Sequence, residues 1–223
     1  MARKPRLYLE GCAQHVIQRG NNRDVCFYAE ADYAFYLDAL KDASIKYGVA
    51  VHAFVLMTNH VHMLVTPADR CGVSKMMQAL GRDYVRYINI TYKRTGSLWE
   101  GRFKSCLVNS DRYFLTVSRY IELNPLRAGM VNHPGEYPWS SYRYSGMGIK
   151  IKLIQPHMCY LDLGKTGASR VLAYRKLFDN ELNKEELGDI RLSTQKEWVI
   201  GSKKFRDQIE VALQRKNTSW GGR

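Results

Sequence analysis

Apolar and polar residues alternate with two different periods along the first 125 residues of the chain. A two-residue period, typical of a half-buried strand, runs through residues 13–19 and ends at the turn residues Gly20-Asn21-Asn22. Two further apolar runs meet at Thr58-Asn59, which predicts a hairpin. The strands predicted in this way are residues 13–19, 49–57, 60–66 and 103–109.

A longer period of three to four residues indicates helices between and after these strands. In the first helix Phe35, Leu40 and Ile45 are the expected inward contacts, and Asp32 is the expected N-cap. The order β-α-β-β-α-β, followed by one more helix, is that of a ferredoxin-like fold of the α+β class. It predicts an antiparallel sheet with helices on one face, and the other face is free to hold a site. The predicted helices are residues 31–47, 73–93 and 111–123.

The pattern changes after Met130, where loop-forming residues become frequent. A stretch rich in glycine, serine and charge favours a boundary at about residues 145–155. We therefore expect a domain over residues 1–148 and a small, basic, mainly helical extension over residues 149–223. Within the extension, helices are predicted at residues 168–177 and 203–214.

The chain carries 34 Lys and Arg against 21 Asp and Glu, a formal net charge of +13. This excess favours a polyanionic partner, either nucleic acid or an anionic membrane surface. Nucleic acid is preferred, because no basic helix with a wide apolar face is predicted. No apolar run reaches the roughly 20 residues that span a bilayer, no secretory signal is recognisable, and the five cysteines form no CxxC pair. We expect a cytoplasmic protein that does not bind membranes.

His60 and His62 lie two residues apart on a predicted strand, so both imidazoles project from the same face. Two imidazoles from one strand can ligate one divalent cation. Leu64 is the next residue on that face and cannot ligate a metal, so a third ligand has to come from elsewhere in the chain. Alternatively, local hydrogen bonds satisfy the two histidines and no metal binds.

Tyr120 and Asn124 form a second pair, four residues apart, which would share one face of a helix. Tyrosine can act as a covalent nucleophile, and an asparagine oxygen can ligate a hard cation. Pro125 disfavours helical geometry at Asn124. The alternative interpretation makes Tyr120 a core aromatic and Asn124 a cap at the end of the helix.

Five blocks of the sequence together resemble the single-tyrosine transposases of the HUH superfamily. The run MTNHVHMLV at residues 57–65 is similar to the family signature MxNHxHxL, and RYIELNPLRAG at residues 119–129 is similar to its YxxxN helix. Residues 15–22, 97–104 and 137–142 resemble three further family blocks, in the family's order. The branch that the chain resembles most is that of the REP-associated tyrosine transposases, because asparagine stands four residues after the tyrosine and a long extension follows.

This resemblance implies a ferredoxin-like domain in which two histidines and the polar residue after the tyrosine hold Mg²⁺ or Mn²⁺. Carried onto this chain, the ligands are His60, His62 and Asn124. Tyr120 would attack the phosphorus of single-stranded DNA, form a 5′-phosphotyrosine link and release a 3′-OH. The family's DNA is a repetitive extragenic palindrome (REP), an imperfect hairpin with a short single-stranded foot. A monomer would use its own tyrosine in cis, and a homodimer would exchange the tyrosine helix in trans.

Basic residues interleaved with aromatic residues indicate where DNA would bind, because basic side chains neutralise phosphates and aromatic rings stack on unpaired bases. The basic tail over residues 203–223 is expected either to grip the hairpin stem or to mask the active site. The polar residues after the first strand would read a base or phosphate, or would only form the turn. The DNA-binding candidates are Arg19, Asn21, Asn22, Arg82, Arg86, Arg102, Lys104, Arg119, Lys203 and Lys204.

The expected function is therefore metal-dependent nicking and strand transfer on single-stranded hairpin DNA. One alternative is a hairpin-DNA-binding protein on the same scaffold that does not catalyse the reaction. Another is a replication or conjugation relaxase, which usually has a third histidine in its metal cluster and carries its tyrosine in another part of the chain. In this chain the Tyr120 helix follows the histidine strand, as in the transposases.

Overall fold

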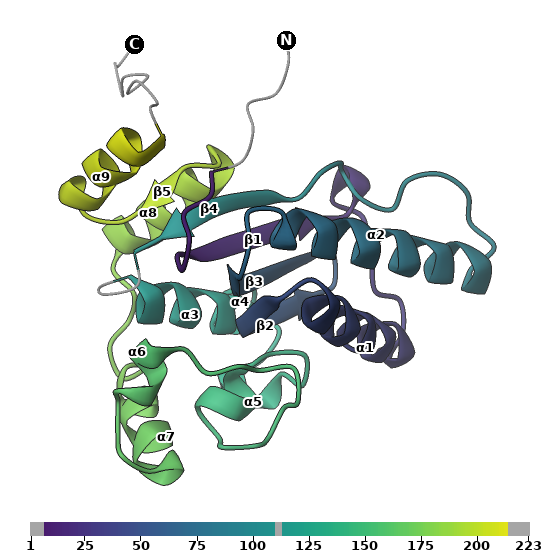
Figure 1. Ribbon diagram of the computed structural model, residues 1–223. Helices are drawn as coiled ribbons and strands as arrows, with labels where there is room; N and C mark the ends of the chain where they lie inside the picture. Colours follow the sequence, from purple (N-terminus) through teal and green to yellow (C-terminus); the bar gives the residue numbers. More distant parts are fainter. Residues whose placement is uncertain (1–6, 110–112, 214–223) are drawn as a thin grey trace.

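A central sheet of five strands organises the molecule (Figure 1). The computed structural model describes residues 7–109 and 113–213 of the chain. The strand order is β2-β3-β1-β4-β5, with antiparallel neighbours except for the parallel pair β4 and β5. The first four strands follow the order of a ferredoxin-like fold, which confirms the predicted fold class. The strands are β1 (Ala13–Arg19), β2 (Val49–Met57), β3 (His60–Pro67), β4 (Lys104–Val108) and β5 (Val199–Ile200).

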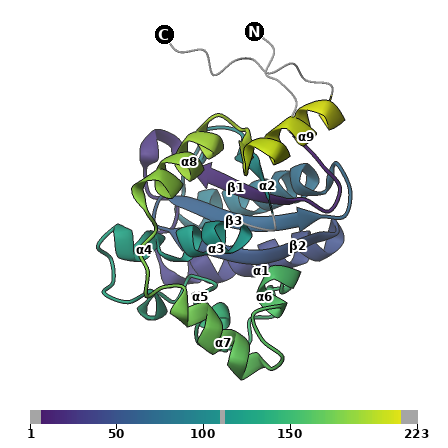
Figure 2. The same ribbon diagram turned by 90° about the vertical axis from the view of Figure 1, so that its left-hand side faces the viewer.

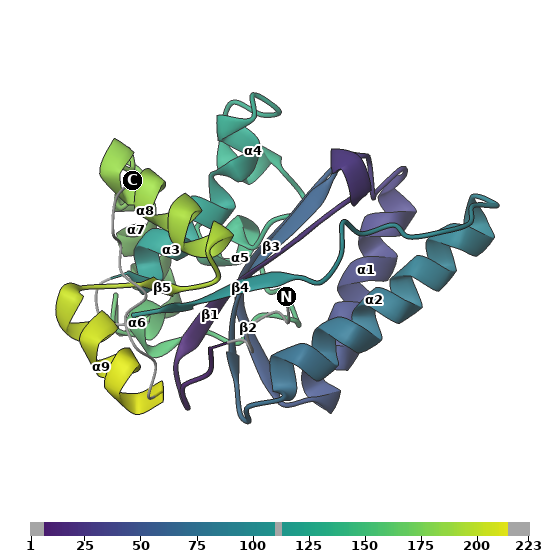
Figure 3. The same ribbon diagram turned by 90° about the horizontal axis from the view of Figure 1, so that it is seen from above.

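Helices lie on both faces of this sheet (Figure 3). α1 (Glu30–Lys46) and α2 (Gly72–Thr91) cover one face, and α3 (Phe114–Glu122) and α8 (Lys184–Gln195) lie on the other. Among the described residues, no helix has the length and apolar character that a membrane crossing requires. The remaining helices are η1 (Asn21–Arg23), α4 (Asn124–Arg127), η2 (Pro134–Glu136), α5 (Tyr142–Ser145), α6 (Met158–Leu161), α7 (Gly167–Lys176) and α9 (Lys203–Leu213). The start of the predicted helix 111–123 lies outside the described residues.

The face of the sheet beneath α1 and α2 is apolar. The two-residue period of β3 turns Val61, Met63 and Val65 to this side, where they pack in one core with Leu80 and Ile88 of α2. All five side chains are buried. This face therefore supplies the large apolar core that a domain of this size needs.

The expected inward contacts of α1 are only partly right. Leu40 is buried, but Phe35 and Ile45 are 36% and 69% exposed. The buried line of α1 runs through residues 32, 36 and 40, which are spaced by four and share one face, and Phe35 and Ile45 fall outside that line. Asp32 is not the N-cap, which is Ala29, but lies at the third helical position and accepts the backbone N–H of Ala29.

The opposite face of the sheet combines apolar packing with buried polar side chains. Leu64 of β3 packs with Val117 and Ile121 of α3. His15 of β1 and His62 of β3 project to the same side as Leu64, and both are buried. This face was expected to be free for a site, but α3 and α8 cover it, so any site has to lie between the sheet and these helices.

The later part of the chain lies along both edges of the sheet. Beside β2, the Leu56 N–H donates to the Trp139 carbonyl and the Ser141 N–H donates to the Phe54 carbonyl, each at 2.9 Å. Beside β4, the two residues of β5 add a parallel strand. Both edges are thus paired with segments of the same chain, which reduces the backbone groups available for pairing with another chain.

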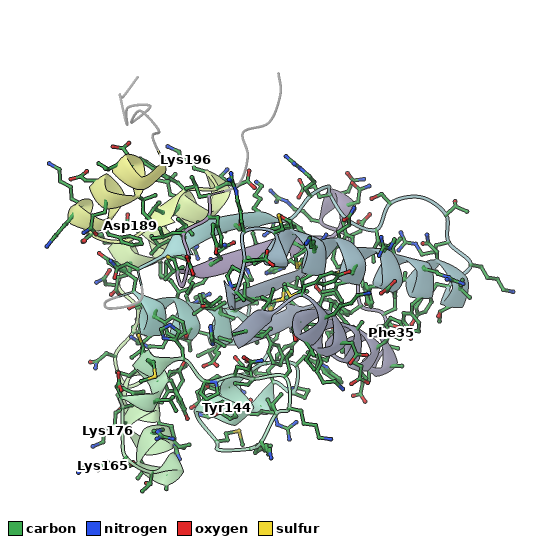
Figure 4. The ribbon with its side chains drawn as sticks, in the orientation of Figure 1. Phe35, Tyr144, Lys165, Lys176, Asp189 and Lys196 are labelled. Atoms are coloured by element: carbon green, nitrogen blue, oxygen red, sulfur yellow. The ribbon has the colours of Figure 1, made fainter. Side chains whose placement is uncertain are left out.

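The extension over residues 149–223 divides between two places. α6 and α7 lie beside α5 at one end of the molecule, whereas α8 and β5 lie along the sheet (Figure 1). In Figure 4, Lys165 and Lys176 lie by α7, far from Asp189 of α8. The predicted helices 168–177 and 203–214 correspond to α7 and α9, but α8 and β5 were not predicted. β5 has only two residues and takes its hydrogen bonds from β4, so a local pattern cannot indicate it.

Candidate active site

A cavity of about 850 Å³ opens on the face of the sheet that carries α3 and α8. In Figure 2 these two helices lie in front of the sheet; α3 contacts β3 and α8 contacts β1. Strand residues of β1 and β3 form its floor, and residues of α3, α4 and α8 form its walls. Seven of the predicted site residues line it: Arg19, His60, His62, Arg102, Lys104, Tyr120 and Asn124. The cavity therefore brings the two predicted pairs together.

His60 is oriented by the residue that precedes it. Its Nδ1 lies 2.6 Å from Oδ1 of Asn59, and the Asn59 amide nitrogen donates to the Arg23 carbonyl at 2.9 Å. Because the amide nitrogen is the donor to Arg23, the amide oxygen accepts, and Nδ1 of His60 has to donate to it. A neutral His60 then carries its lone pair on Nε2, the atom that a metal would use.

His62 is oriented by a residue that the motif analysis did not single out as a site residue. Its Nδ1 lies 2.8 Å from Nε2 of His15, and the two rings are stacked with centroids 5.0 Å apart. His15 lines the cavity from β1, next to the strand that carries His62. The signal available in the sequence was position: residues 13, 15 and 17 of the predicted strand share one face, and His15 is the polar member of that set.

The three histidines are neutral at neutral pH. Burial lowers the pKa of His15 to about 3 and that of His60 to about 4. Burial also lowers the pKa of His62 well below its usual value, and the positive charges of Arg127 and Arg19 act in the same direction. Neutral imidazole is the form that ligates a metal. Burial therefore keeps these rings in the protonation state that metal binding requires.

Tyr120 reaches the same place from α3. The side chain is 7% exposed, and its ring meets the rings of His15 and His62 edge to face, with centroids 5.9 Å and 5.8 Å away. Asn124, four residues further, donates its amide N–H groups to the carbonyls of Tyr120 at 3.0 Å and Ile121 at 3.2 Å. Asn124 thus caps the end of α3 with its nitrogen, and its amide oxygen is the atom that would ligate a cation.

Arg127 is a further candidate that sequence analysis missed. Its guanidinium carbon lies 4.3 Å from the centroid of the Tyr120 ring, and its Nη2 donates to the Tyr120 carbonyl at 2.7 Å. Residues seven apart lie on the same side of a helix, which brings Arg127 of α4 back over Tyr120. The guanidinium holds the ring from one side by a cation–π contact.

Polar groups continue from the cavity along the ends of two strands. Arg19 is the last residue of β1, and Arg102 and Lys104 lie at the start of β4. Asn21 and Asn22 follow in η1 and are exposed. Asn22 has a φ of 52°, a region that asparagine enters more readily than most residues. The structure therefore places these five DNA-binding candidates at the cavity or directly beside it.

Four other DNA-binding candidates lie on distant surfaces. Arg82 and Arg86 are exposed on α2, across the sheet from the cavity (Figure 3). Lys203 and Lys204 are exposed on α9, and neither lines the cavity. The rest of the predicted basic tail, residues 214–223, lies outside the described residues.

Arg119 points from α3 toward the extension. Its guanidinium donates to the carbonyl of Asn180 and lies 5.7 Å from the centroid of the Phe178 ring. The contact with DNA that we predicted for Arg119 would require these contacts to be given up. In this structure the side chain instead ties the tyrosine helix to the segment between α7 and α8.

The polar groups of the cavity fit a divalent cation. No group of three or more His, Cys, Asp or Glu side chains within residues 7–109 and 113–213 is arranged to hold a metal, so a third ligand has to be of another type. His60 offers the lone pair of Nε2, His62 offers an imidazole nitrogen and Asn124 offers its amide oxygen. Two nitrogen donors and one oxygen donor suit Mn²⁺ and are compatible with Mg²⁺. All three donors are neutral, so they would not neutralise the charge of a bound cation, which could then attract a phosphate.

Transposases are among the known proteins to which the chain is similar. The family model for IS200-like transposases matches residues 8–124. A REP-associated tyrosine transposase bound to a REP hairpin has a similar fold, with a TM-score of 0.57 and 17% identity over 70% of this chain and 93% of that chain. A candidate transposase from Deinococcus radiodurans R1 aligns at a TM-score of 0.39 and 23% identity, over 54% of this chain and 96% of that chain. No curated protein matched the chain significantly.

Proposed function

The chain belongs to the IS200-like transposase family, and from this membership and the geometry of the cavity we propose that it nicks and rejoins single-stranded hairpin DNA in the cytoplasm. The observation that supports the proposal most is the convergence of four side chains on one cavity: His60 and His62 from β3, Tyr120 from α3 and Asn124 from α4. These are the residue types that a tyrosine nucleophile assisted by a metal requires.

In the proposed reaction the phenolic oxygen of Tyr120 attacks the phosphorus of a DNA phosphodiester. The bond between phosphorus and the 3′ oxygen breaks, which leaves a 5′-phosphotyrosine and a free 3′-OH. The phenol proton is released and the departing 3′ oxygen takes up a proton, so charge and atoms balance. Attack by another strand's 3′-OH reverses the step. No external energy source is needed, because one phosphodiester bond is exchanged for another.

The side chains around Tyr120 divide the remaining tasks. Arg127 holds the Tyr120 ring and its backbone in place. Asn59 and His15 each bond Nδ1 of one of the two histidines, which leaves the two Nε2 atoms for a metal. His60, His62 and Asn124 would hold a Mg²⁺ or Mn²⁺ ion, which would supply positive charge to the scissile phosphate.

We propose that the DNA strand enters along the end of β1. Arg19, Arg102 and Lys104 line the cavity and would neutralise its phosphates, and Asn21 and Asn22 would contact an exposed base or the backbone. The hairpin is proposed as the substrate because the chain is strongly basic and because the similar solved transposase is bound to a REP hairpin. Tyr120 lies beside the histidines of its own chain, which supports a monomer that acts in cis.

The experiment that tests this proposal uses a labelled single-stranded hairpin with its 5′ flank, incubated with Mn²⁺ and run on a denaturing protein gel. We expect a labelled protein band from the wild type and none from Tyr120→Phe or His60→Ala. Tyr144→Phe is the matched control, because Tyr144 lies in α5, outside the cavity (Figure 4), and its loss should leave the band unchanged. Tight hairpin binding by all variants with no band across several candidate hairpins would leave only the non-catalytic DNA-binding alternative.

A further inference from the structure

A chain of three hydrogen bonds connects the extension to His62. The Thr194 hydroxyl of α8 donates to the Ile190 carbonyl one turn earlier, at 2.7 Å. Nδ1 of His15 lies 2.9 Å from the same hydroxyl oxygen, and Nε2 of His15 lies 2.8 Å from Nδ1 of His62. His15 and Thr194 are separated by 179 residues, and all three side chains are buried.

The direction of this chain follows from proton counting. A threonine hydroxyl has one proton, and the Ile190 carbonyl can only accept it. The hydroxyl oxygen therefore accepts from Nδ1–H of His15. A neutral His15 then has its lone pair on Nε2, so Nδ1 of His62 has to be the donor across the 2.8 Å contact. His62 is left with its proton on Nδ1 and its lone pair on Nε2.

The opposite direction would disable His62 as a ligand. If Thr194 donated to His15, then Nε2 of His15 would carry a proton and donate to His62. The proton of His62 would then lie on Nε2, the atom that would have to ligate the metal. The carbonyl of Ile190 decides between the two states, because it takes the only proton that Thr194 has.

We propose that Thr194 and His15 are positioning residues that keep the proton of His62 on Nδ1, so that the extension completes the metal site of the N-terminal fold. The inference rests on the proposed function in assigning His62 as a ligand. Its counterpart on His60 is Asn59, which belongs to the same hairpin as His60. One metal ligand is thus set by its neighbour in sequence, and the other is set by a residue of α8. Second-shell partners of this kind commonly change metal affinity by about 10–100-fold.

The first measurement is the tautomer of His62 in metal-free wild-type protein. Two-dimensional ¹H–¹⁵N spectra of ¹⁵N-histidine-labelled protein at neutral pH separate protonated from unprotonated ring nitrogens. The resonances are assigned from His15→Gln and His62→Gln spectra. We expect the proton of His62 on Nδ1 and that of His15 on Nδ1. A wild-type spectrum with the His62 proton on Nε2 would overturn the inference without any variant having to fold.

The second measurement is Mn²⁺ affinity, by titration followed with electron paramagnetic resonance and without DNA. Thr194→Val removes the acceptor of His15, which favours moving the His15 proton to Nε2 and the His62 proton to Nε2. We expect Mn²⁺ to bind at least about tenfold more weakly. Thr194→Ser keeps the hydroxyl and should restore both the tautomer and the affinity. Ser193→Ala is the matched control, because this neighbouring buried hydroxyl donates only to the Val199 carbonyl.

These outcomes are separable from those of the DNA assay. A tautomer and Mn²⁺ affinity that are unchanged in Thr194→Val would refute the positioning role, even if the wild type forms the covalent DNA link. An unchanged affinity with a shifted tautomer would refute it too, because His62 would then not need its Nε2 lone pair. If no DNA link forms but Thr194→Val still shifts the tautomer and weakens Mn²⁺ binding, the inference stands and only the proposed chemistry fails.

Discussion

The two faces of the sheet are assembled in different ways. The face beneath α1 and α2 is covered by helices that directly connect its own strands, and its core is apolar. The face beneath α3 and α8 is covered by segments from later in the chain, and it buries polar side chains such as His15, His62 and Thr194. Buried polar groups cost free energy unless they are hydrogen-bonded, and here each is paired across segments distant in sequence. The candidate site therefore lies on the face that is assembled from segments distant in sequence.

The largest expected effect is on the apolar face. Leu80→Ala in α2 should lower the free energy of unfolding by about 4 kcal/mol, because Leu80 is fully buried and its removal leaves a cavity. Ile90→Ala on the same helix is the control. Because Ile90 is 69% exposed, this substitution should change the free energy of unfolding by less than about 0.5 kcal/mol. Urea denaturation measures both. If Leu80→Ala weakened Mn²⁺ binding by the folded protein, the two faces would not be independent.

The next effect is a pH dependence from the polar face. His52 of β2 bonds the Gln155 carbonyl and the Thr66 hydroxyl, and burial lowers its pKa from 6.5 to about 4. Between these two pH values the unfolded chain binds a proton that the folded chain does not, so folding stability falls as the pH drops from 6.5 to 4. The wild type should therefore lose about 2 to 3 kcal/mol more folding stability than His52→Gln when the pH falls from 6.5 to 4.

Denaturation curves recorded from pH 8 to pH 4 test this expectation. The exposed His133→Gln serves as a control for the loss of a histidine. Parallel pH profiles for the wild type and His52→Gln would show that His52 titrates alike in the folded and unfolded states. Water would then reach His52 on the polar face more readily than its burial indicates.

A smaller effect is expected at Arg127. Arg127→Gln removes the cation–π contact with Tyr120, worth about 1 kcal/mol, and should slow formation of the covalent DNA link about five- to tenfold. Arg175→Gln, which removes an exposed charge on α7, should leave the rate unchanged. Single-turnover labelling measures both rates. Equal slowing by both variants would assign the effect to net charge and not to the position of the tyrosine.

The smallest effect distinguishes the two faces as DNA-binding surfaces. Lys104→Ala should weaken hairpin binding a few-fold and lower the slope of log affinity against log salt by about one, because Lys104 lines the cavity. Arg86→Ala removes a charge from α2, across the sheet, and should change neither quantity. Filter binding at several salt concentrations measures both. A larger effect of Arg86→Ala than of Lys104→Ala would place the DNA over α2, as the sequence analysis predicted for Arg86.

Sequence patterns predicted most of the sheet and the helices α1, α2 and α3 that cover it, but not α8 or β5. The alternation in β1 and the apolar runs of β2 and β3 are local properties, so these strands were predicted to within one residue of their observed bounds. The orientation of α1 was predicted less well, because Ile45 stays 69% exposed and Phe35 lies at the margin of the core, where its exposed ring stacks on Tyr87 of α2. β5 was missed because its partner β4 lies some 90 residues away in the chain. α8 had a local signal, the capping box of Asn183 and Glu186, which the sequence analysis overlooked.

The candidate site shows the same division. The spacing of His60 and His62, and that of Tyr120 and Asn124, was enough to predict that each pair shares a face. That the two pairs meet in one cavity is a finding of the structure. The role of Arg119 was not visible either, since its contacts with Asn180 and Phe178 join α3 to a segment some 60 residues later.

By itself, the sequence determined the order of the elements, the face on which each histidine lies and the charge that favours a polyanion. These depend on chain geometry over a few residues and on composition. Only the tertiary structure decided which nitrogen of His62 is free, because that depends on His15 from another strand and on Thr194, 179 residues from His15. Hydrogen bonds between such segments exist only after the sheet and α8 have packed, and no local periodicity encodes them.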